Sequence, residues 1–321
     1  MKETRTALVT GASSGLGFET AAQLAEQGYG RVIITGRTED KAETARRALV
    51  DRTDQDVFEP LALDNGHLDT VDAAATRLAD RGGRIDLLVL NAGLAPAREI
   101  SRTPDGIEAT MASTLTGHHL LTMRLLEHGL LGAKARIVIS GSEAARGDVP
   151  TMSPVDITAY AAENFAGDLE AAIESQLRME APADYKPNDV YATAKVFVAW
   201  WAAELARKLP AGITVNAVSP GSTPDTNAAR SAPFLMKYLM LPVFKLIPGM
   251  SHSIDKGAGR YLEVAGQGDE VTGKFFASKA KKMTGPLHVM DMDHFDRPAE
   301  QKALWTVTTK LAGGVGYPAI A

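Results

Sequence analysis

Cysteine is absent from this chain of 321 residues, so disulfides and thiolate chemistry are excluded from its structure and its activity. An excess of basic residues is also missing: the net charge is −5 at pH 7, which offers no basic surface for nucleic acid. No apolar run is long enough for a transmembrane helix. No linker rich in proline and serine divides the chain, which favours one large domain.

The remaining composition is typical of a globular protein, with 45% hydrophobic and 23% charged residues. Short apolar runs alternate along the chain with longer stretches of helical character. The first apolar run begins within a few residues of the amino terminus and leaves no room for a signal peptide, so the expected location is cytoplasmic.

The apolar runs predict seven strands, several of them apolar on both faces as in a buried parallel sheet. These strands are expected at residues 7–10, 31–35, 57–63, 85–90, 136–140, 213–219 and 274–277. Helices are expected at residues 15–27, 40–51, 68–81, 106–127 and 191–209. The alternation predicts an α/β fold, a Rossmann-type doubly wound parallel sheet with helices on both faces, in a single domain.

Three stretches extend beyond the alternating core. They are a helical insertion at about 147–187, an apolar segment at about 222–260 and a C-terminal extension at 279–321, with a helix expected at 299–311. The apolar segment is interpreted as a substrate lid, with weak contact to a membrane surface as the alternative. Apolar residues recur at every fourth position of the insertion and predict one helical stripe: Phe165, Leu169, Ile173 and Leu177.

A glycine-rich turn follows the first predicted strand and opens the first predicted helix. Glycine lets the backbone turn sharply and approach a pyrophosphate, whose charge the helix amino terminus then meets. Close packing alone would also explain such a turn, but its position between strand and helix favours a dinucleotide site. The predicted cofactor-contacting residues of this turn are Gly11, Ser13, Ser14, Gly15, Leu16 and Gly17.

The end of the second predicted strand carries Gly36 and then Arg37. A dinucleotide fold that prefers NAD usually places a carboxylate here, where it accepts hydrogen bonds from the ribose hydroxyls. Arginine instead can form paired hydrogen bonds with a 2′-phosphate. The expected cofactor is therefore NADP(H), with a solvated surface arginine as the alternative reading of Arg37.

Tyr191 and Lys195 are one helical turn apart and share a helix face. A tyrosine with its ordinary pKa of ~10 transfers protons poorly at neutral pH, and a nearby ammonium lowers that pKa. Ser142 follows another apolar run and would add a hydrogen-bond donor for a substrate oxygen. The three side chains together are typical of a proton-transfer site beside a hydride carrier.

Four motifs stand in a defined order along the chain: the glycine turn, Asn91-Ala92-Gly93, Ser142, and Tyr191 with Lys195. In this order they resemble the short-chain dehydrogenase/reductase family, from about residue 5 to residue 273. The resemblance implies that Tyr191 is the acid/base and also contacts the cofactor, and that Lys195 also holds the nicotinamide ribose. It implies further cofactor contacts at Asn91, Ala92, Gly93, Asp64, Pro220, Gly221 and Thr223. For Asp64 a helix cap is the alternative, and for Thr223 the alternative is Thr226.

Thr114 stands where the family often has an asparagine that supports a proton relay, and it completes the candidate catalytic residues. The insertion, the apolar segment and the tail resemble the branch of retinol dehydrogenases and light-dependent protochlorophyllide oxidoreductase. Ser222 departs from the latter, which has cysteine after its Pro-Gly pair. His118 is interpreted as a packing histidine of the family pattern.

The predicted function is NADPH-dependent hydride transfer to or from a carbonyl or secondary alcohol in a largely apolar small molecule. The alternatives are reduction of a carbon–carbon double bond in a conjugated or tetrapyrrole-like substrate, and a nicotinamide-binding sensor or scaffold with little turnover. The inserted helix predicts a monomer or homodimer. No metal site is expected, because the following residues are interpreted as caps and a solvated loop: His288, Asp291, Asp293, His294 and Asp296.

Overall fold

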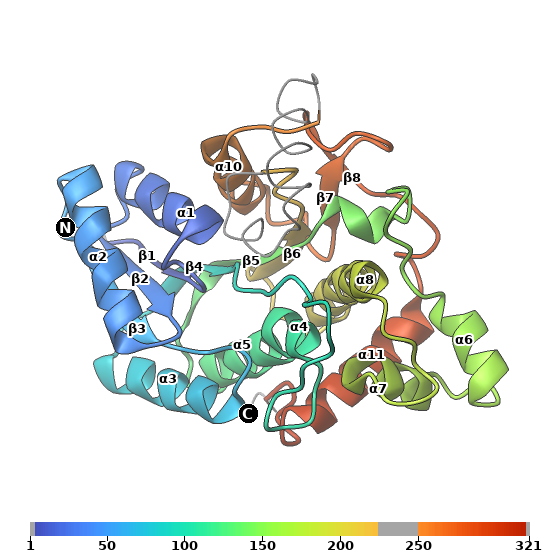
Figure 1. The fold of residues 1–321 in the computed structure, drawn as a ribbon. Helices are drawn as coiled ribbons and strands as arrows, with labels where there is room; N and C mark the ends of the chain where they lie inside the picture. Colours follow the sequence, from blue (N-terminus) through green and yellow to red (C-terminus); the bar gives the residue numbers. More distant parts are fainter. Residues whose placement is uncertain (1–3, 224–249, 319–321) are drawn as a thin grey trace.

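An eight-stranded sheet forms the centre of the computed structural model, which describes residues 4–223 and 250–318 (Figure 1). The strand order is β3-β2-β1-β4-β5-β6-β7-β8; the first seven strands are parallel, and β8 pairs antiparallel with β7. The strands are β1 Thr6–Val9, β2 Arg31–Gly36, β3 Phe58–Ala62, β4 Ile85–Leu90, β5 Leu131–Ser140, β6 Thr214–Val218, β7 Phe275–Ser278 and β8 Leu287–Val289. The predicted doubly wound sheet is confirmed.

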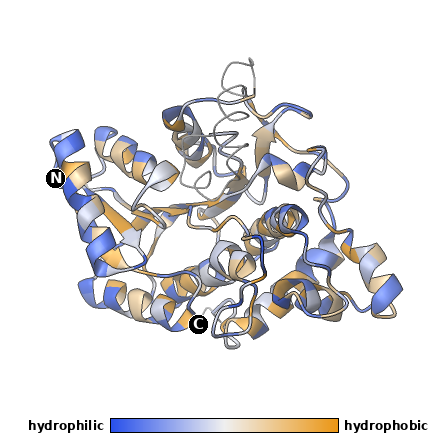
Figure 2. Ribbon diagram, in the orientation of Figure 1, coloured by the Kyte–Doolittle hydropathy of each residue, from blue (hydrophilic) through white to orange (hydrophobic). Residues whose placement is uncertain are grey.

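Helices cover both faces of this sheet (Figure 1). One face carries α1 Gly15–Glu26, α2 Glu39–Thr53 and α10 Ile254–Ala265. The other carries α3 Leu68–Arg81, α5 Gly117–Glu127 and α8 Pro187–Ala206. The strands are apolar on both sides, and the outer faces of helices such as α2 and α3 are hydrophilic (Figure 2).

The strand order brings the candidate motifs to one edge of the sheet. The order reverses between β1 and β4, because β1 is followed in the chain by β2 on one side while β4 pairs on the other. A crevice therefore opens at the carboxyl ends of these two strands, where this class of fold binds its ligands. The glycine turn follows β1, Asn91 follows β4, and Ser142 follows β5 at the same edge.

The helix expected at 106–127 is interrupted. A short helix α4 at Ala109–Met111 leads into a π-helical turn at Ala112–Thr116, and only then does α5 begin. Glu108 caps α4 by accepting hydrogen bonds from the backbone N–H groups of Thr110 and Met111. Residues 110–123 are all buried, so their apolar residues do not mark one helix face whose shift at the π turn could reveal the break.

The insertion also differs from the predicted single stripe. It forms a 3-10 turn η2 at Glu143–Arg146 and two helices, α6 Ile157–Asn164 and α7 Leu169–Arg178. Phe165 is the C-cap of α6, and Ala166 and Gly167 then adopt positive φ. The predicted stripe therefore spans the loop between two separate helices. Asp168 begins α7 by accepting the N–H of Ala171.

The tail forms α11 at Pro298–Leu311, close to its predicted position. This helix packs against α7 and α8, so the insertion and the tail together cover the side of α8 that faces away from the sheet (Figure 1). Most of the predicted apolar lid, residues 224–249, lies outside the described residues. Residues 254–260, predicted as the end of this lid, instead form the first half of α10, which packs on α1.

None of the helices within residues 4–223 and 250–318 combines the length and apolarity that crossing a bilayer requires.

Candidate active site

The glycine turn has the backbone geometry that a closely bound phosphate requires. Gly11 and Gly15 have φ of +65° and +63°, which other residues rarely adopt. The first turn of α1 carries no acidic side chain, so its amino-terminal partial charge is not offset there. The turn therefore fits a pyrophosphate, and Ser13, Ser14 and Leu16 lie within it as predicted.

Asn91 fastens this turn to the end of β4. Its Nδ2 donates a hydrogen bond to the carbonyl oxygen of Thr10 at 2.9 Å. A Cβ on Gly17 would lie 2.5 Å from that same nitrogen, and one on Gly11 would lie 2.9 Å from Cα of Ala92. Glycine is thus required at both positions for the glycine turn to contact the Asn91-Ala92-Gly93 motif. Gly93 itself is exposed beside this contact.

Arg37 lies exposed just beyond β2 and makes no ion pair with another described residue. Its guanidinium is therefore available to an anionic group at the end of this strand. Asp64 follows β3, and its Oδ1 accepts the N–H of Gly66 at 3.0 Å. This turn contact accounts for one oxygen of Asp64, and the second stays available for a ligand.

Tyr191, Ser142 and Lys195 converge beyond the end of β5. A hydrogen bond with Ser142 lowers the pKa of Tyr191, but burial has the larger effect and holds that pKa above its ordinary value. Lys195 Nζ lies 5.6 Å from the centre of the Tyr191 ring and donates to the carbonyl oxygen of Ser140 at 2.7 Å. The Lys195 side chain is only 4% exposed, and burial lowers its pKa to about 7.

This geometry corrects one expectation drawn from the sequence. An ammonium at Lys195 was expected to lower the pKa of Tyr191, whereas in this structure Ser142 is the group that lowers it. The reason is that Lys195 is itself buried, which weakens its own charged state, and its nitrogen is directed at a backbone carbonyl.

Pro220 and Gly221 follow β6 at the same edge of the sheet. The Pro220 carbonyl accepts a hydrogen bond from Nε2 of His252 at 2.7 Å, and Gly221 has φ of +78°. A Cβ on Gly257, in the first turn of α10, would lie 2.7 Å from Cγ2 of Thr223 and 2.9 Å from Cδ2 of Leu16. Thr223 therefore lies beside the glycine turn, whereas Thr226 is outside the described residues.

Tyr261 is a site residue that sequence reasoning missed. It is fully buried on α10, and its hydroxyl lies 2.9 Å from Oγ of Ser140 and 3.2 Å from Oδ1 of Asn91. It thus joins the end of β5 to the end of β4. Ala258, Tyr261 and Val264 recur at helical spacing and could have predicted α10, but residues up to about 260 were interpreted as the lid and no helix was predicted after them.

The comparisons with known proteins agree with this arrangement. The profile of the family described as short chain dehydrogenase matches residues 5–172. The chain belongs to the short-chain dehydrogenase family. It is 26% identical to human retinol dehydrogenase 13 over 96% of this chain and 85% of that protein. It is also 26% identical to the chloroplastic protochlorophyllide reductase of Chlamydomonas reinhardtii, over 97% and 79% of the two chains.

Solved structures show the same fold. A short chain dehydrogenase from Burkholderia cenocepacia, in complex with NADP, superposes with a TM-score of 0.60 and 25% identity over 85% of this chain and 95% of that one. Short-chain dehydrogenases use NAD(P)(H), and the glycine turn, Arg37 and Lys195 of this chain fit such a group. This protein is therefore an oxidoreductase of the short-chain dehydrogenase family.

His118 is a packing residue of this short-chain dehydrogenase and not a proton donor. Its Nδ1 donates to the carbonyl oxygen of Thr114 at 3.0 Å, so its Nε2 accepts the hydroxyl of Thr10 at 2.9 Å. Burial lowers the pKa of His118 to about 3, which keeps the ring neutral.

Thr114 lies in the π-helical turn with its Oγ1 buried and without a hydrogen-bond partner among the described residues. A Cβ on Gly93 would lie 3.1 Å from this oxygen, so the hydroxyl faces the loop that follows β4. Thr114 is therefore close to the implied cofactor site, and whether it takes part in a relay stays a prediction.

We expect Thr114→Asn to fold and to show equal or higher kcat, because it restores the amide that the family often has at this relay position, with two N–H donors in place of one hydroxyl. Circular dichroism and steady-state kinetics measure the two properties. A folded Thr114→Asn protein without activity would contradict the relay position assigned to this residue.

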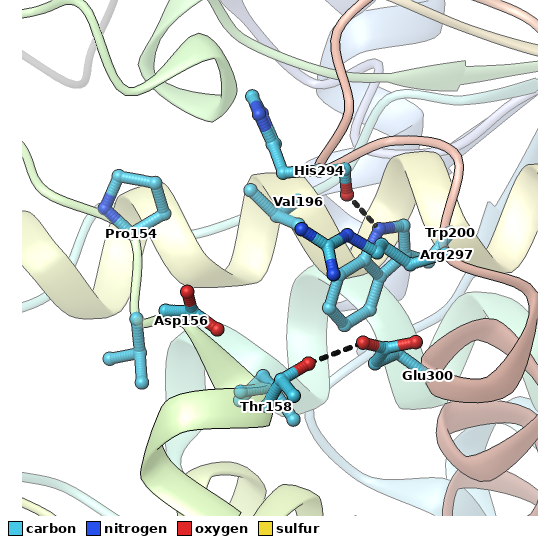
Figure 3. A pocket seen from close by; sticks show the side chains of 10 residues that line it. Pro154, Asp156, Thr158, Val196, Trp200, His294, Arg297 and Glu300 are labelled. Carbon is cyan, nitrogen blue, oxygen red and sulfur yellow. Dashed lines mark hydrogen bonds between the residues drawn. The ribbon is translucent and has the colours of Figure 1, made fainter.

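A small hollow lies away from these residues, between the insertion, α8 and the start of α11 (Figure 3). Trp200 closes it by donating its indole N–H to the carbonyl oxygen of His294 at 2.7 Å, and Thr158 bonds Glu300 across it. His294 in turn bonds the carbonyl oxygen of Ala145 through Nε2. The hollow thus lies where the insertion packs against the tail. Within residues 4–223 and 250–318 no group of three or more metal-ligating side chains is found.

Proposed function

We propose that this protein is an NADPH-dependent reductase, or the reverse dehydrogenase, acting on a carbonyl or secondary alcohol in a largely apolar small molecule. The observation that carries the proposal is the position of the Tyr191 hydroxyl. It is hydrogen-bonded with Ser142, its ring lies beside Lys195, and it stands at the sheet edge where the glycine turn lies. A proton donor and a nucleotide cradle are thus held at one crevice.

The side chains have separate tasks in this proposal. NADPH would supply the hydride. Ser142 accepts the N–H of Ala144 at 3.2 Å, so its own proton remains free to bind the substrate oxygen or Tyr191. Tyr191 gives its proton to the oxygen as the carbonyl becomes an alcohol, and its raised pKa keeps that proton in place until then.

An apolar substrate is favoured by the loop that follows Gly93. Leu94 and Ile100 are 41% and 36% exposed there, and large apolar side chains with this exposure are few among the described residues. Their position beside the crevice offers a contact for hydrocarbon. A panel of apolar ketones, aldehydes, enones and alcohols, followed by the cofactor absorbance, tests the proposal, and no turnover with any class would contradict it.

A second candidate is reduction of a conjugated carbon–carbon double bond. It is favoured by the similarity to a protein named protochlorophyllide reductase, which extends over nearly the whole chain. An enone in the panel separates the two reactions, because carbonyl reduction yields an allylic alcohol and double-bond reduction yields a saturated ketone.

Cofactor preference is expected to favour NADPH over NADH because of Arg37. Losing a charge-assisted contact with the 2′-phosphate costs about 1.5–3 kcal/mol, or roughly tenfold to a hundredfold in affinity. Titration of Arg37→Ala with both cofactors should show weaker NADPH binding and unchanged NADH binding. Equal affinities for the two cofactors in the unaltered protein would contradict the preference.

The oligomeric state is expected to be a monomer or a homodimer. Many family members form tetramers through the helices that correspond to α5 and α8, and here α11 packs on both helices. Light scattering measures the molecular mass, and a tetramer would contradict this expectation. The cytoplasmic location and the weak membrane-surface contact stay predictions.

A further inference from the structure

A buried ion pair lies next to Ser142 of the candidate active site. Glu143 follows Ser142 in the chain and is 2% exposed, and Arg260 on α10 is 4% exposed. Arg260 Nη1 lies 3.2 Å from Oε1 of Glu143. Burying two charges is unfavourable unless further hydrogen bonds satisfy them, so a pair at this depth requires an explanation.

The hydrogen bonds of the pair reach three separate segments of the chain. Arg260 donates to the carbonyl oxygens of Ser219 at 3.0 Å and Gly285 at 2.6 Å, and to Oγ of Ser278 at 2.9 Å. Glu143 accepts hydrogen bonds from the hydroxyls of Ser219 and Ser278. The ends of β6 and β7 are therefore fastened to the residue next to Ser142.

The connection to β6 matters because Pro220 and Gly221 come next. The Ser219 hydroxyl, which bonds Glu143, also accepts the N–H of Gly221 at 3.2 Å. One carboxylate thus positions the backbone that carries Ser142 and, through Ser219, the backbone expected to wall the nicotinamide.

We propose that Glu143 and Arg260 are positioning residues that hold Ser142 and the Ser219–Gly221 segment in one fixed relation, and that the charge of Glu143 tunes proton transfer at Tyr191. The inference rests on the proposed function. It assigns to the pair a role in turnover beyond its contribution to folding.

Electrostatics supports the second half of the proposal. Burial raises the pKa of Tyr191 most, and the charge of Glu143, which follows Ser142 in the chain, raises it further; Arg260 forms an ion pair with that carboxylate. Among the described residues, Lys195 lies beside the Tyr191 ring, Tyr261 interacts with Tyr191, and His252 interacts with both members of the pair.

Glu143→Gln tests the tuning. The amide keeps an oxygen for Arg260 and Ser278 and can donate to Ser219, so the fold should persist, while the negative charge is lost. Because this charge raises the pKa of Tyr191, its removal should move the Tyr191-dependent limb of the pH–rate profile to lower pH. A limb at the same pH as in the unaltered protein would overturn the tuning.

Arg260→Lys tests the positioning. Lysine keeps the charge but cannot reach Glu143, Ser219, Ser278 and Gly285 together. We expect kcat to fall on the order of tenfold to a hundredfold, since displacement of catalytic groups by about 1 Å costs this much. NADPH affinity should change less, because the hydrogen bonds that Arg260 makes with the described residues involve neither the glycine turn nor Arg37. A kcat equal to that of the unaltered protein would overturn the positioning role.

Arg146→Lys is the matched control. Arg146 is equally buried and binds the carbonyl oxygens of Ser278 and Lys282 at 2.7 and 2.8 Å, but makes none of its hydrogen bonds with Glu143 or Ser219. Equal losses of kcat in Arg146→Lys and Arg260→Lys would show that the pair only stabilises the turn at residues 278–285, and would overturn the inference.

If Arg260→Lys fails to fold in thermal melts, the pH profile of Glu143→Gln tests the inference instead. All comparisons use a substrate whose turnover Tyr191→Phe abolishes, so failure of the proposed function is recognised separately.

Discussion

Tyr191→Phe is expected to retain NADPH binding and to lose most turnover, by about 10²- to 10⁴-fold in kcat. The substitution removes only the hydroxyl that transfers the proton and leaves the ring beside Lys195. Binding of the nucleotide should persist because the glycine turn and Lys195 are unchanged. Fluorescence titration measures the binding, and single-turnover absorbance measures the chemical step.

Tyr160→Phe is the matched control for this experiment. Its hydroxyl bonds Oγ of Ser175 at 3.0 Å within the insertion, remote from the sheet edge. It should keep full turnover. Near-normal activity of Tyr191→Phe on a confirmed substrate would show that another group transfers the proton. Absence of any turnover by the unaltered protein, with NADPH bound, would favour the sensor or scaffold alternative.

Lys195→Met is expected to abolish turnover and to change how stability depends on pH. In the folded protein the pKa of Lys195 is about 7, below its ordinary value of 10.5. Between these values the unfolded chain holds a proton at Lys195 that the folded chain has lost, so folding becomes more favourable as the pH rises. From pH 7 to pH 9 the free energy of unfolding of the unaltered protein should therefore rise by about 2 kcal/mol more than that of Lys195→Met.

Chemical denaturation of both proteins at several pH values measures that difference. The comparison isolates Lys195, because every other group titrates in both proteins. A difference in the free energy of unfolding that stays constant from pH 7 to pH 9 would show that Lys195 keeps its ordinary pKa. Loss of NADPH affinity in Lys195→Met is expected as well, since this lysine is implied to hold the nicotinamide ribose.

The fold was predictable because its signals are local. Runs of apolar residues on both faces make buried parallel strands, and the turn from Gly11 to Gly17 has few other conformational solutions. The break within 106–127 and the two-helix insertion were missed. Apolar spacing reports which side chains are buried. Around the π turn all side chains from residue 110 to residue 123 are buried, and the spacing from Phe165 to Leu169 matches one helix by coincidence.

The sequence by itself determined the family, the order of its motifs and the residues Ser142, Tyr191 and Lys195. Only the tertiary structure decided how these residues behave. Burial of these two polar side chains, which the spacing of apolar residues does not report, lowers the pKa of Lys195 and raises that of Tyr191. Likewise Tyr261 and Arg260 join the site from α10, more than a hundred positions after Ser142, because the sheet brings β5, β6 and β7 together at one edge. Contacts of this kind depend on strand order, and strand order is a property of the whole chain.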